Sequence, residues 1–169
     1  MNAILFLTAC VNPSGMAFTK LNNPEVRVRQ YKEALDWYLE NTEFHILLVE
    51  NSNYDFSKDY QGFIDEGRLE YLTFDGNNFD RSKGKGYGEA AILDYGLKHS
   101  QFLGKMQSSQ LVIKVTGRLL CTNINYLLKD YHTEGTLYAN IAKDDWGGQH
   151  LDKPICYSSC FFLERLFLA

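Results

Sequence analysis

Two segments combine basic side chains with glycine, and both could bind an anionic ligand. They are Lys83-Gly-Lys-Gly-Tyr-Gly-Glu-Ala90 and Leu111-Val-Ile-Lys-Val-Thr-Gly-Arg-Leu-Leu120. Glycine lets the backbone approach a ligand closely, and backbone N–H groups and cationic side chains stabilise phosphate oxygens. The two segments therefore predict a diphosphate site, and with it an enzyme of nucleotide-activated substrates.

The first segment departs from the common phosphate-binding motifs. It lacks GxxxxGK[ST], and its glycines run G-x-G-x-G after the third expected strand instead of forming a dinucleotide fingerprint after the first. We interpret it as a basic loop and helix start that meets a diphosphate through Lys83, Lys85 and Gly86. A surface loop with solvated lysines is an equally compatible interpretation.

The second segment places three polar residues on one side of an expected strand: Lys114, Thr116 and Arg118. Lys114 lies inside an apolar run, where an unpaired ammonium would be costly, so it should find a carboxylate or reach a ligand phosphate. Arg118 follows Gly117 and could bind a phosphate through two N–H groups. The alternative is a structural ion pair.

Two further segments carry carboxylates. Glu50, Asn51 and Ser52 close the second expected strand and could accept hydrogen bonds from a ribose or a base edge, although an ordinary Asx-type turn explains them as well. Asp144 and Asp145 could hold a divalent metal or supply a general base. A solvated acidic turn is an equal alternative for this second segment.

Composition excludes several classes of protein. The formal net charge of −4 argues against a general nucleic-acid binder. The four cysteines show no CxxC pair, the four histidines no ligand spacing, and no nucleophile motif occurs. No apolar run reaches the roughly 18 residues of a membrane span, and no signal peptide is evident. We therefore expect a cytoplasmic protein with reduced thiols.

The elements that must position these residues follow from hydrophobic periodicity over a chain of 169 residues, a length typical of one domain. Strands are expected at residues 3–9, 44–49, 68–73, 110–115, 136–141 and 155–157. Helices are expected at residues 25–40, 57–66, 86–99 and 123–131, with a final helix capped by Ser158 or Ser159 and ending at Leu168. This alternation predicts an α/β fold with a mostly parallel central sheet. The polar loops follow strands, so they should meet at one edge of the sheet.

Taken in order, four segments resemble a bacterial glycosyltransferase of the GT-A type, family 2-like, as found in capsule and O-antigen clusters. They are Ile4-Leu-Phe-Leu-Thr-Ala-Cys-Val-Asn12, Leu47-Leu-Val-Glu-Asn-Ser-Asn53, Gly84-Lys-Gly-Tyr-Gly-Glu-Ala-Ala91 and Ile113-Lys-Val-Thr-Gly-Arg118. The resemblance spans roughly residues 3–130. It implies a single GT-A (Rossmann-like) domain over residues 1–169 that transfers a hexose from a nucleotide-diphosphate sugar to a saccharide acceptor in surface polysaccharide synthesis.

The resemblance also implies the site residues. Asp144 or Asp145 would be the catalytic base or a metal ligand. The nucleotide sugar, with UDP favoured, would contact Ala9, Glu50, Asn51, Ser52, Lys83, Lys85, Gly86, Glu89, Lys114, Thr116 and Arg118. No nucleic-acid partner is expected, and peripheral membrane association and oligomeric state are left open.

Two departures from the family weaken parts of this expectation. No Asp-x-Asp follows the fourth expected strand, so a bound Mn²⁺ or Mg²⁺ is left open, and cationic side chains could stabilise the leaving diphosphate instead. The chain is short for such an enzyme, which suggests a minimal or C-terminally truncated domain. The alternative function is a non-catalytic nucleotide-binding or protein-interaction module of the same fold.

Overall fold

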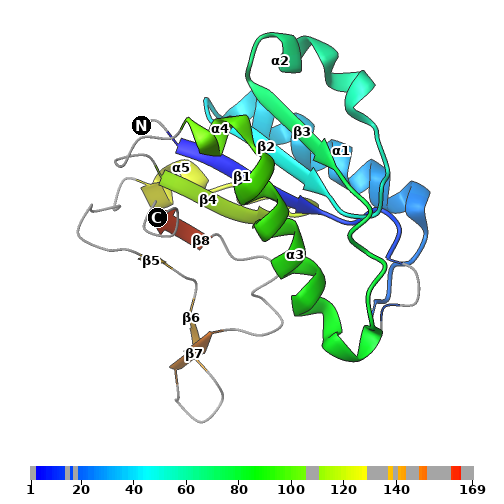
Figure 1. The fold of residues 1–169 in the computed structure, drawn as a ribbon. Coiled ribbons are helices and arrows are strands. Elements are labelled where there is room, and N and C mark those ends of the chain that lie inside the picture. Colours follow the sequence, from blue (N-terminus) through cyan, green and yellow to red (C-terminus); the bar gives the residue numbers. More distant parts are fainter. Residues whose placement is uncertain are drawn as a thin grey trace.

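The computed structural model describes residues 3–13, 16, 19–105 and 111–128, except for the side chains of Lys85 and Leu127, together with the backbone of short strands further on. Its main sheet has six strands in the order β3-β2-β1-β4-β8-β5 (Figure 1). β1 (Ala3–Ala9), β2 (His45–Glu50), β3 (Leu69–Thr73) and β4 (Leu111–Thr116) are mutually parallel. The predicted α/β fold with a mostly parallel sheet is confirmed at this level.

The central strands are buried on both faces, as their continuous apolar runs predict. α1 (Pro24–Asn41) covers one face and α3 (Gly84–His99) covers the other (Figure 1). Successive residues of β1 therefore enter different cores. Leu5 and Leu7 pack with residues of α1, whereas Ile4 and Phe6 pack with residues of α3.

The start of α1 is fixed by local chemistry. The side chain of Asn23 accepts hydrogen bonds from the backbone N–H groups of Glu25 and Val26, and Pro24 occupies the first turn, where it costs no hydrogen bond. Further along α1, the Tyr38 hydroxyl donates to the Leu119 carbonyl at 2.9 Å. This bond ties α1 to the segment that follows β4.

The remaining helices are short: η1 (Ser57–Tyr60), α2 (Gln61–Asp65), η2 (Arg81–Lys83), α4 (Gln101–Gly104) and α5 (Ile124–Leu127). The expected helix at 123–131 is therefore four residues long within the described part of the chain, and residues 129–131 lie outside it. No helix among the described residues has the length and apolar character to cross a bilayer.

The C-terminal region differs from the sequence-based expectation. The final helix was wrong, because residues within it form β8 (Phe161–Glu164), which pairs antiparallel with β4. A short apolar run is compatible with a buried strand as well as with a helix. Here it forms a strand because β4 offers an open edge with which it can pair. The strand expected at 136–141 is divided between β5 (Leu137–Tyr138) and β6 (Ile141–Lys143), and β6 pairs with β7 (Gln149–Leu151). The strand expected at 155–157 lies outside the described residues.

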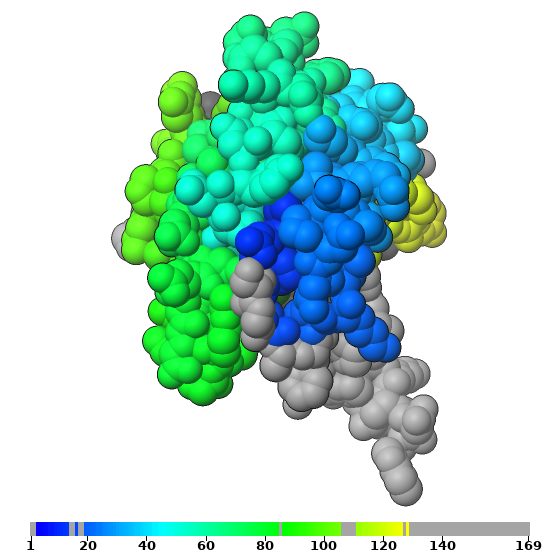
Figure 2. All heavy atoms as spheres, turned by 90° about the vertical axis from the view of Figure 1, so that its right-hand side faces the viewer, coloured from blue at the N-terminus to red at the C-terminus, as the bar shows by residue number. Residues whose placement is uncertain are grey.

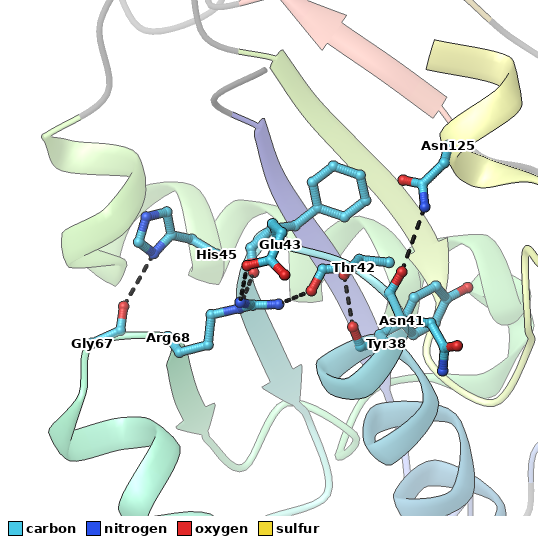
Figure 3. Close-up of polar contacts among 9 residues, drawn as sticks. Tyr38, Asn41, Thr42, Glu43, His45, Gly67, Arg68 and Asn125 are labelled. Atoms are coloured by element: carbon cyan, nitrogen blue, oxygen red, sulfur yellow. Dashed lines mark hydrogen bonds and ion pairs between the residues drawn. The ribbon is translucent and has the colours of Figure 1, made fainter. Parts of the chain in front are cut away.

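The amino-terminal edge of the sheet is held by Arg68 (Figure 3). Its guanidinium donates to the carbonyls of Thr42 and Phe44, the latter at 2.6 Å, and lies 3.3 Å from the Glu43 carboxylate. His45 shares a 3.1 Å hydrogen bond with the Gly67 carbonyl beside it. These contacts fix the turn between α1 and β2 against the turn before β3, so the polar residues at this edge have a structural role.

α3 approaches the sheet closely at Gly96, and this contact yields a prediction. A Cβ at this position would lie 2.4 Å from Cζ of Phe6 and 3.3 Å from Cγ2 of Val49. Gly96→Ala should lower the free energy of unfolding by about 1–3 kcal/mol, since overpacking outweighs the gain in helix propensity. Urea denaturation measures this change. Gly62→Ala is the control, because its added Cβ has no described atom within 4 Å apart from its chain neighbours and the backbone of its own helix. Equal effects of the two variants would contradict the packing argument.

Candidate functional site

A cavity of about 590 Å³ lies at the carboxyl ends of the parallel strands. In Figure 2 the dark blue atoms of the β1 segment lie at the bottom of a hollow between α3, in green, and the beginning of α1, in brighter blue. The described residues that line the cavity are Thr8, Ala9, Cys10, Pro13, Met16, Thr19, Lys20, Leu21, Arg27, Tyr31, Asn51, Asn77, Gly88, Glu89, Ile92, Thr116 and Arg118. This is the edge at which the sequence places its polar loops.

The structure brings some of the candidate residues together at this cavity and not others. The candidates that line it are Ala9, Asn51, Glu89, Thr116 and Arg118. The candidates that lie elsewhere are Glu50, Ser52, Lys83, Gly86 and Lys114. The candidates outside the described residues are Asp144, Asp145 and the side chain of Lys85.

Arg118 and Asn51 both line the cavity, and each has a buried polar atom with no hydrogen-bond partner among the described residues. In Arg118, Nη1 donates to Oε1 of Gln30 at 3.2 Å, and the atom without a described partner is Nε. Asn51 is 2% exposed; its Nδ2 lies 3.5 Å from the Gly88 carbonyl, and its Oδ1 is the atom without a described partner. Buried polar groups are nearly always hydrogen-bonded, so a missing donor or acceptor marks a place where a ligand could supply it.

Gly117 explains how Arg118 reaches the cavity. Its backbone N–H donates to the Thr8 carbonyl at 2.9 Å, which extends the β1–β4 pairing by one residue. A Cβ at this position would lie 3.0 Å from that same carbonyl oxygen and 3.3 Å from the Tyr31 ring. Only glycine permits this close approach without a shift of the backbone, and the next residue, Arg118, leaves the sheet at its edge.

Glu50 has a different position from the one expected for a ribose contact. It is fully buried, and its carboxylate accepts hydrogen bonds from the backbone N–H groups of Val11, Ser52 and Tyr54 at 2.8–2.9 Å. The hydroxyls of Ser52 and Thr73 donate to it as well. Both carboxylate oxygens are thus engaged by the protein. Glu50 and Ser52 shape the loops at the ends of β1, β2 and β3 and do not face the cavity.

Lys114 pairs with a carboxylate, which is one of the two outcomes expected for it and matches the structural ion pair given as the alternative to a phosphate contact. It is 2% exposed, and its ammonium bonds to Oε1 of Glu89, which lies on the side of α3. The Thr8 hydroxyl donates to the same oxygen at 3.3 Å. The pair therefore joins the middle of β4 to α3, with Glu89 on the cavity side.

The basic loop before α3 does not meet the cavity through the described residues. Lys83 is exposed, and its ammonium lies 4.4 Å from the centre of the Tyr87 ring, a cation–π contact at the surface. Gly86 is exposed as well. The cavity contacts α3 along its side, at Gly88, Glu89 and Ile92, instead of at its first turn.

Arg27 is a cavity residue that sequence reasoning missed. It is 6% exposed, and its guanidinium donates to the carbonyls of Cys10 and Leu21 and to the Tyr31 hydroxyl, at 2.8, 3.2 and 3.2 Å. A signal existed, because Arg27 lies four residues before Tyr31 on the apolar face of α1. A charged residue on such a face must find partners, and that requirement could have identified it.

Charge distinguishes the cavity from the rest of the chain. Its described lining contains three cationic residues, Lys20, Arg27 and Arg118, and one carboxylate, Glu89, whereas the whole chain has a formal net charge of −4. Among the described residues, no group of three His, Cys, Asp or Glu side chains could hold a metal ion. The local excess of positive charge suits an anionic ligand that the side chains bind directly.

Cys10 lines the cavity but is a poor nucleophile. Burial raises the pKa of its thiol to about 11, and the Glu50 carboxylate adds to this increase, while the positive charges of Arg27, Arg81 and Arg118 only partly oppose it. The thiolate is the reactive form of cysteine, so a raised pKa leaves Cys10 with very little of this form at neutral pH. Covalent catalysis by this residue is therefore not supported.

Comparisons with family models, with curated protein sequences and with solved structures found no match for this chain. Any assignment of function therefore depends on the geometry and charge of the cavity, together with the α/β fold that creates it.

The buried carboxylate of Glu50 yields a prediction about stability. In Glu50→Gln the side-chain amide would direct hydrogens at backbone N–H groups that now donate to the carboxylate, and we expect a loss of about 3 kcal/mol in the free energy of unfolding. Urea denaturation measures it. Glu33→Gln serves as the control. Among the described residues Glu33 pairs with Arg29 alone, at 3.7 Å and exposed to solvent, so this substitution should change stability by less than about 0.5 kcal/mol. A loss for Glu50→Gln as small as this would contradict the role given to the carboxylate.

The raised pKa of Cys10 yields a prediction about reactivity. At pH 8 a thiol with a pKa of about 11 has roughly 100-fold less thiolate than one near 9, so iodoacetamide should modify Cys10 about 100-fold more slowly in the folded protein. The rate should rise as the pH approaches 11. Mass spectrometry of the Cys10 peptide measures both rates, with urea-unfolded protein as the reference. Equal rates at pH 8 in folded and unfolded protein would refute the expectation.

Proposed function

We propose that this protein binds a nucleotide-diphosphate sugar in the cavity and transfers the sugar to a saccharide acceptor in surface polysaccharide synthesis. The observation that carries the proposal is that Arg118 and Asn51 line the same cavity and that each has a polar atom without a partner among the described residues, Nε of Arg118 and Oδ1 of Asn51. One is a cationic donor and the other a neutral acceptor. A nucleoside diphosphate has the complementary groups, since phosphate oxygens accept hydrogen bonds and the nucleoside donates them.

The size and charge of the cavity support the same ligand class. Its volume of about 590 Å³ falls within the range of roughly 300–1,000 Å³ that small-molecule sites occupy. Lys20, Arg27 and Arg118 give it positive charge. UDP is favoured as the nucleotide on the basis of the resemblance to GT-A enzymes alone, and GT-A membership is itself part of this proposal.

In this mechanism Arg118 stabilises the charge that develops on the leaving diphosphate, because a fixed cation in a partly desolvated site acts most strongly where negative charge increases. Gly117 holds the backbone of that residue against β1, so its position is preorganised. Asp144 or Asp145 would accept the proton of the acceptor hydroxyl. That assignment depends on the resemblance and on residues outside the described part of the chain.

A second candidate function is nucleotide binding without sugar transfer. It is favoured by one observation: Glu89, the only carboxylate among the described lining residues, is already paired with Lys114 and hydrogen-bonded to Thr8. A carboxylate held in this way is less available as a general base. Within the described residues, the cavity thus has the means to bind a diphosphate but lacks an evident catalytic base.

Isothermal calorimetry with UDP, GDP and CDP tests the proposal. The wild-type protein should bind at least one of them, and Arg118→Ala should bind it about tenfold or more weakly, because a hydrogen bond to a charged group is lost. Arg29→Ala is the matched control, since Arg29 is an exposed arginine on α1. If the wild type binds none of the three nucleotides, both candidate functions are wrong.

Turnover separates the two candidates once binding is established. Hydrolysis or transfer of the matching nucleotide sugar by the wild type, lost in Asp145→Ala, is expected for the transferase. A protein that binds the nucleotide and shows neither reaction with any saccharide acceptor tried would favour the binding module.

A further inference from the structure

The Glu89–Lys114 pair has a marked asymmetry of exposure. The Lys114 side chain is 3% exposed, whereas that of Glu89 is 29% exposed. The ammonium and the Thr8 hydroxyl both bond to Oε1 of Glu89, and its other oxygen receives no hydrogen bond from a described residue. The carboxylate is therefore anchored through one oxygen, the other is free of described partners, and Glu89 lines the cavity.

Stability alone does not account for this pair. Removing the Lys114 ammonium from water costs several kcal/mol, and apolar residues often stabilise a protein as well as a buried ion pair does, or better. Lys114 lies opposite Phe6 on β1, and the neighbouring core contains apolar residues such as Ile92, so an apolar side chain would suit this position. A charge retained there at the border of a cavity is better explained by contact with a ligand.

Short contacts connect Glu89 to the neighbourhood of both groups assigned to the nucleotide, Asn51 and Arg118. The adjacent Gly88 carbonyl is 3.5 Å from Nδ2 of Asn51. Lys114 bonds to Glu89 and lies 3.5 Å from the hydroxyl of Thr116, two residues before Arg118. A carboxylate in a cavity that is otherwise cationic repels phosphate but accepts hydrogen bonds from hydroxyl groups.

We propose that Glu89, held in place by Lys114, binds a hydroxyl group of the sugar carried by the nucleotide and so distinguishes a nucleotide sugar from the bare nucleoside diphosphate. This inference rests on the proposed function. Lys114 is a positioning residue, because it contacts Glu89 and fixes the orientation of the carboxylate. The bond to the hydroxyl is charge-assisted, and a site built in this way rejects a ligand that lacks the hydroxyl.

The test compares two ligands in one variant. Glu89→Gln combined with Lys114→Met removes both charges of the pair and leaves no buried charge unpaired. Calorimetry then measures the Kd of the nucleoside diphosphate that the wild type binds, and of hexose and N-acetylhexosamine derivatives with the same base. We expect the nucleoside diphosphate to bind within about twofold of wild type, and the preferred nucleotide sugar about tenfold or more weakly.

A second comparison identifies the hydroxyl and guards against misfolding. Nucleotide sugars lacking one hydroxyl each should bind the wild type about tenfold more weakly at a single position, and that difference should vanish in the double variant. If the double variant does not fold, Glu89→Asp retains the charge beside Lys114, shortens the side chain and should weaken binding of the nucleotide sugar alone.

The outcomes separate this inference from the proposed function. Absence of nucleoside diphosphate binding by the wild type would overturn the proposed function. The other informative case is a wild type that binds the diphosphate. If the variants then lose the same affinity for both ligands, or lose affinity for neither, the role of Glu89 is wrong and the proposed nucleotide site still stands.

Discussion

The carboxyl edge of the sheet depends on one buried carboxylate. Glu50 accepts hydrogen bonds from backbone N–H groups in the loop after β1 and in the loop after β2. The Thr73 hydroxyl, at the end of β3, donates to it as well. Three chain segments that would otherwise expose unpaired donors are thereby drawn around one negative charge. The loops that border the cavity keep their shape because this charge has no access to water and must be satisfied by them.

The parallel part of the fold could be predicted because its signals are local and redundant. Runs such as residues 3–9 are apolar throughout, and Asn23-Pro24 marks the start of α1 through capping that requires no tertiary information. The identity of β8 could not be predicted in the same way. Whether residues 161–164 form a helix or a strand depends on the open edge of β4, a partner about 50 residues away, and no local pattern encodes that pairing.

The sheet edge at which the cavity lies could be predicted, whereas the side chains that line the cavity could be predicted only in part. Strand order brings Asn51, Thr116 and Arg118 to one edge, as the alternation of elements implies. The direction of each side chain is a different matter. Glu50 is buried among the loops, whereas its neighbour Asn51 lines the cavity. The alternation of side chains along a strand predicts that two neighbours face opposite sides, but it does not predict which of them faces a ligand. The position of Arg27 on the apolar face of α1 indicates that its charge needs partners, but it does not indicate that these partners are backbone carbonyls beside the cavity.

Arg27 also affects how the cavity can vary. By bonding to the carbonyls of both Cys10 and Leu21, one guanidinium holds the two ends of a loop together at its base. The entropy of closing a loop grows slowly with its length once its ends are fixed. Changes in length between Pro13 and Leu21 should therefore add little closure entropy, whereas Val11 and Asn12 are held by Glu50, Ser52 and Asn77. The rim of the cavity could in this way acquire a new ligand preference while the strand ends stay unchanged.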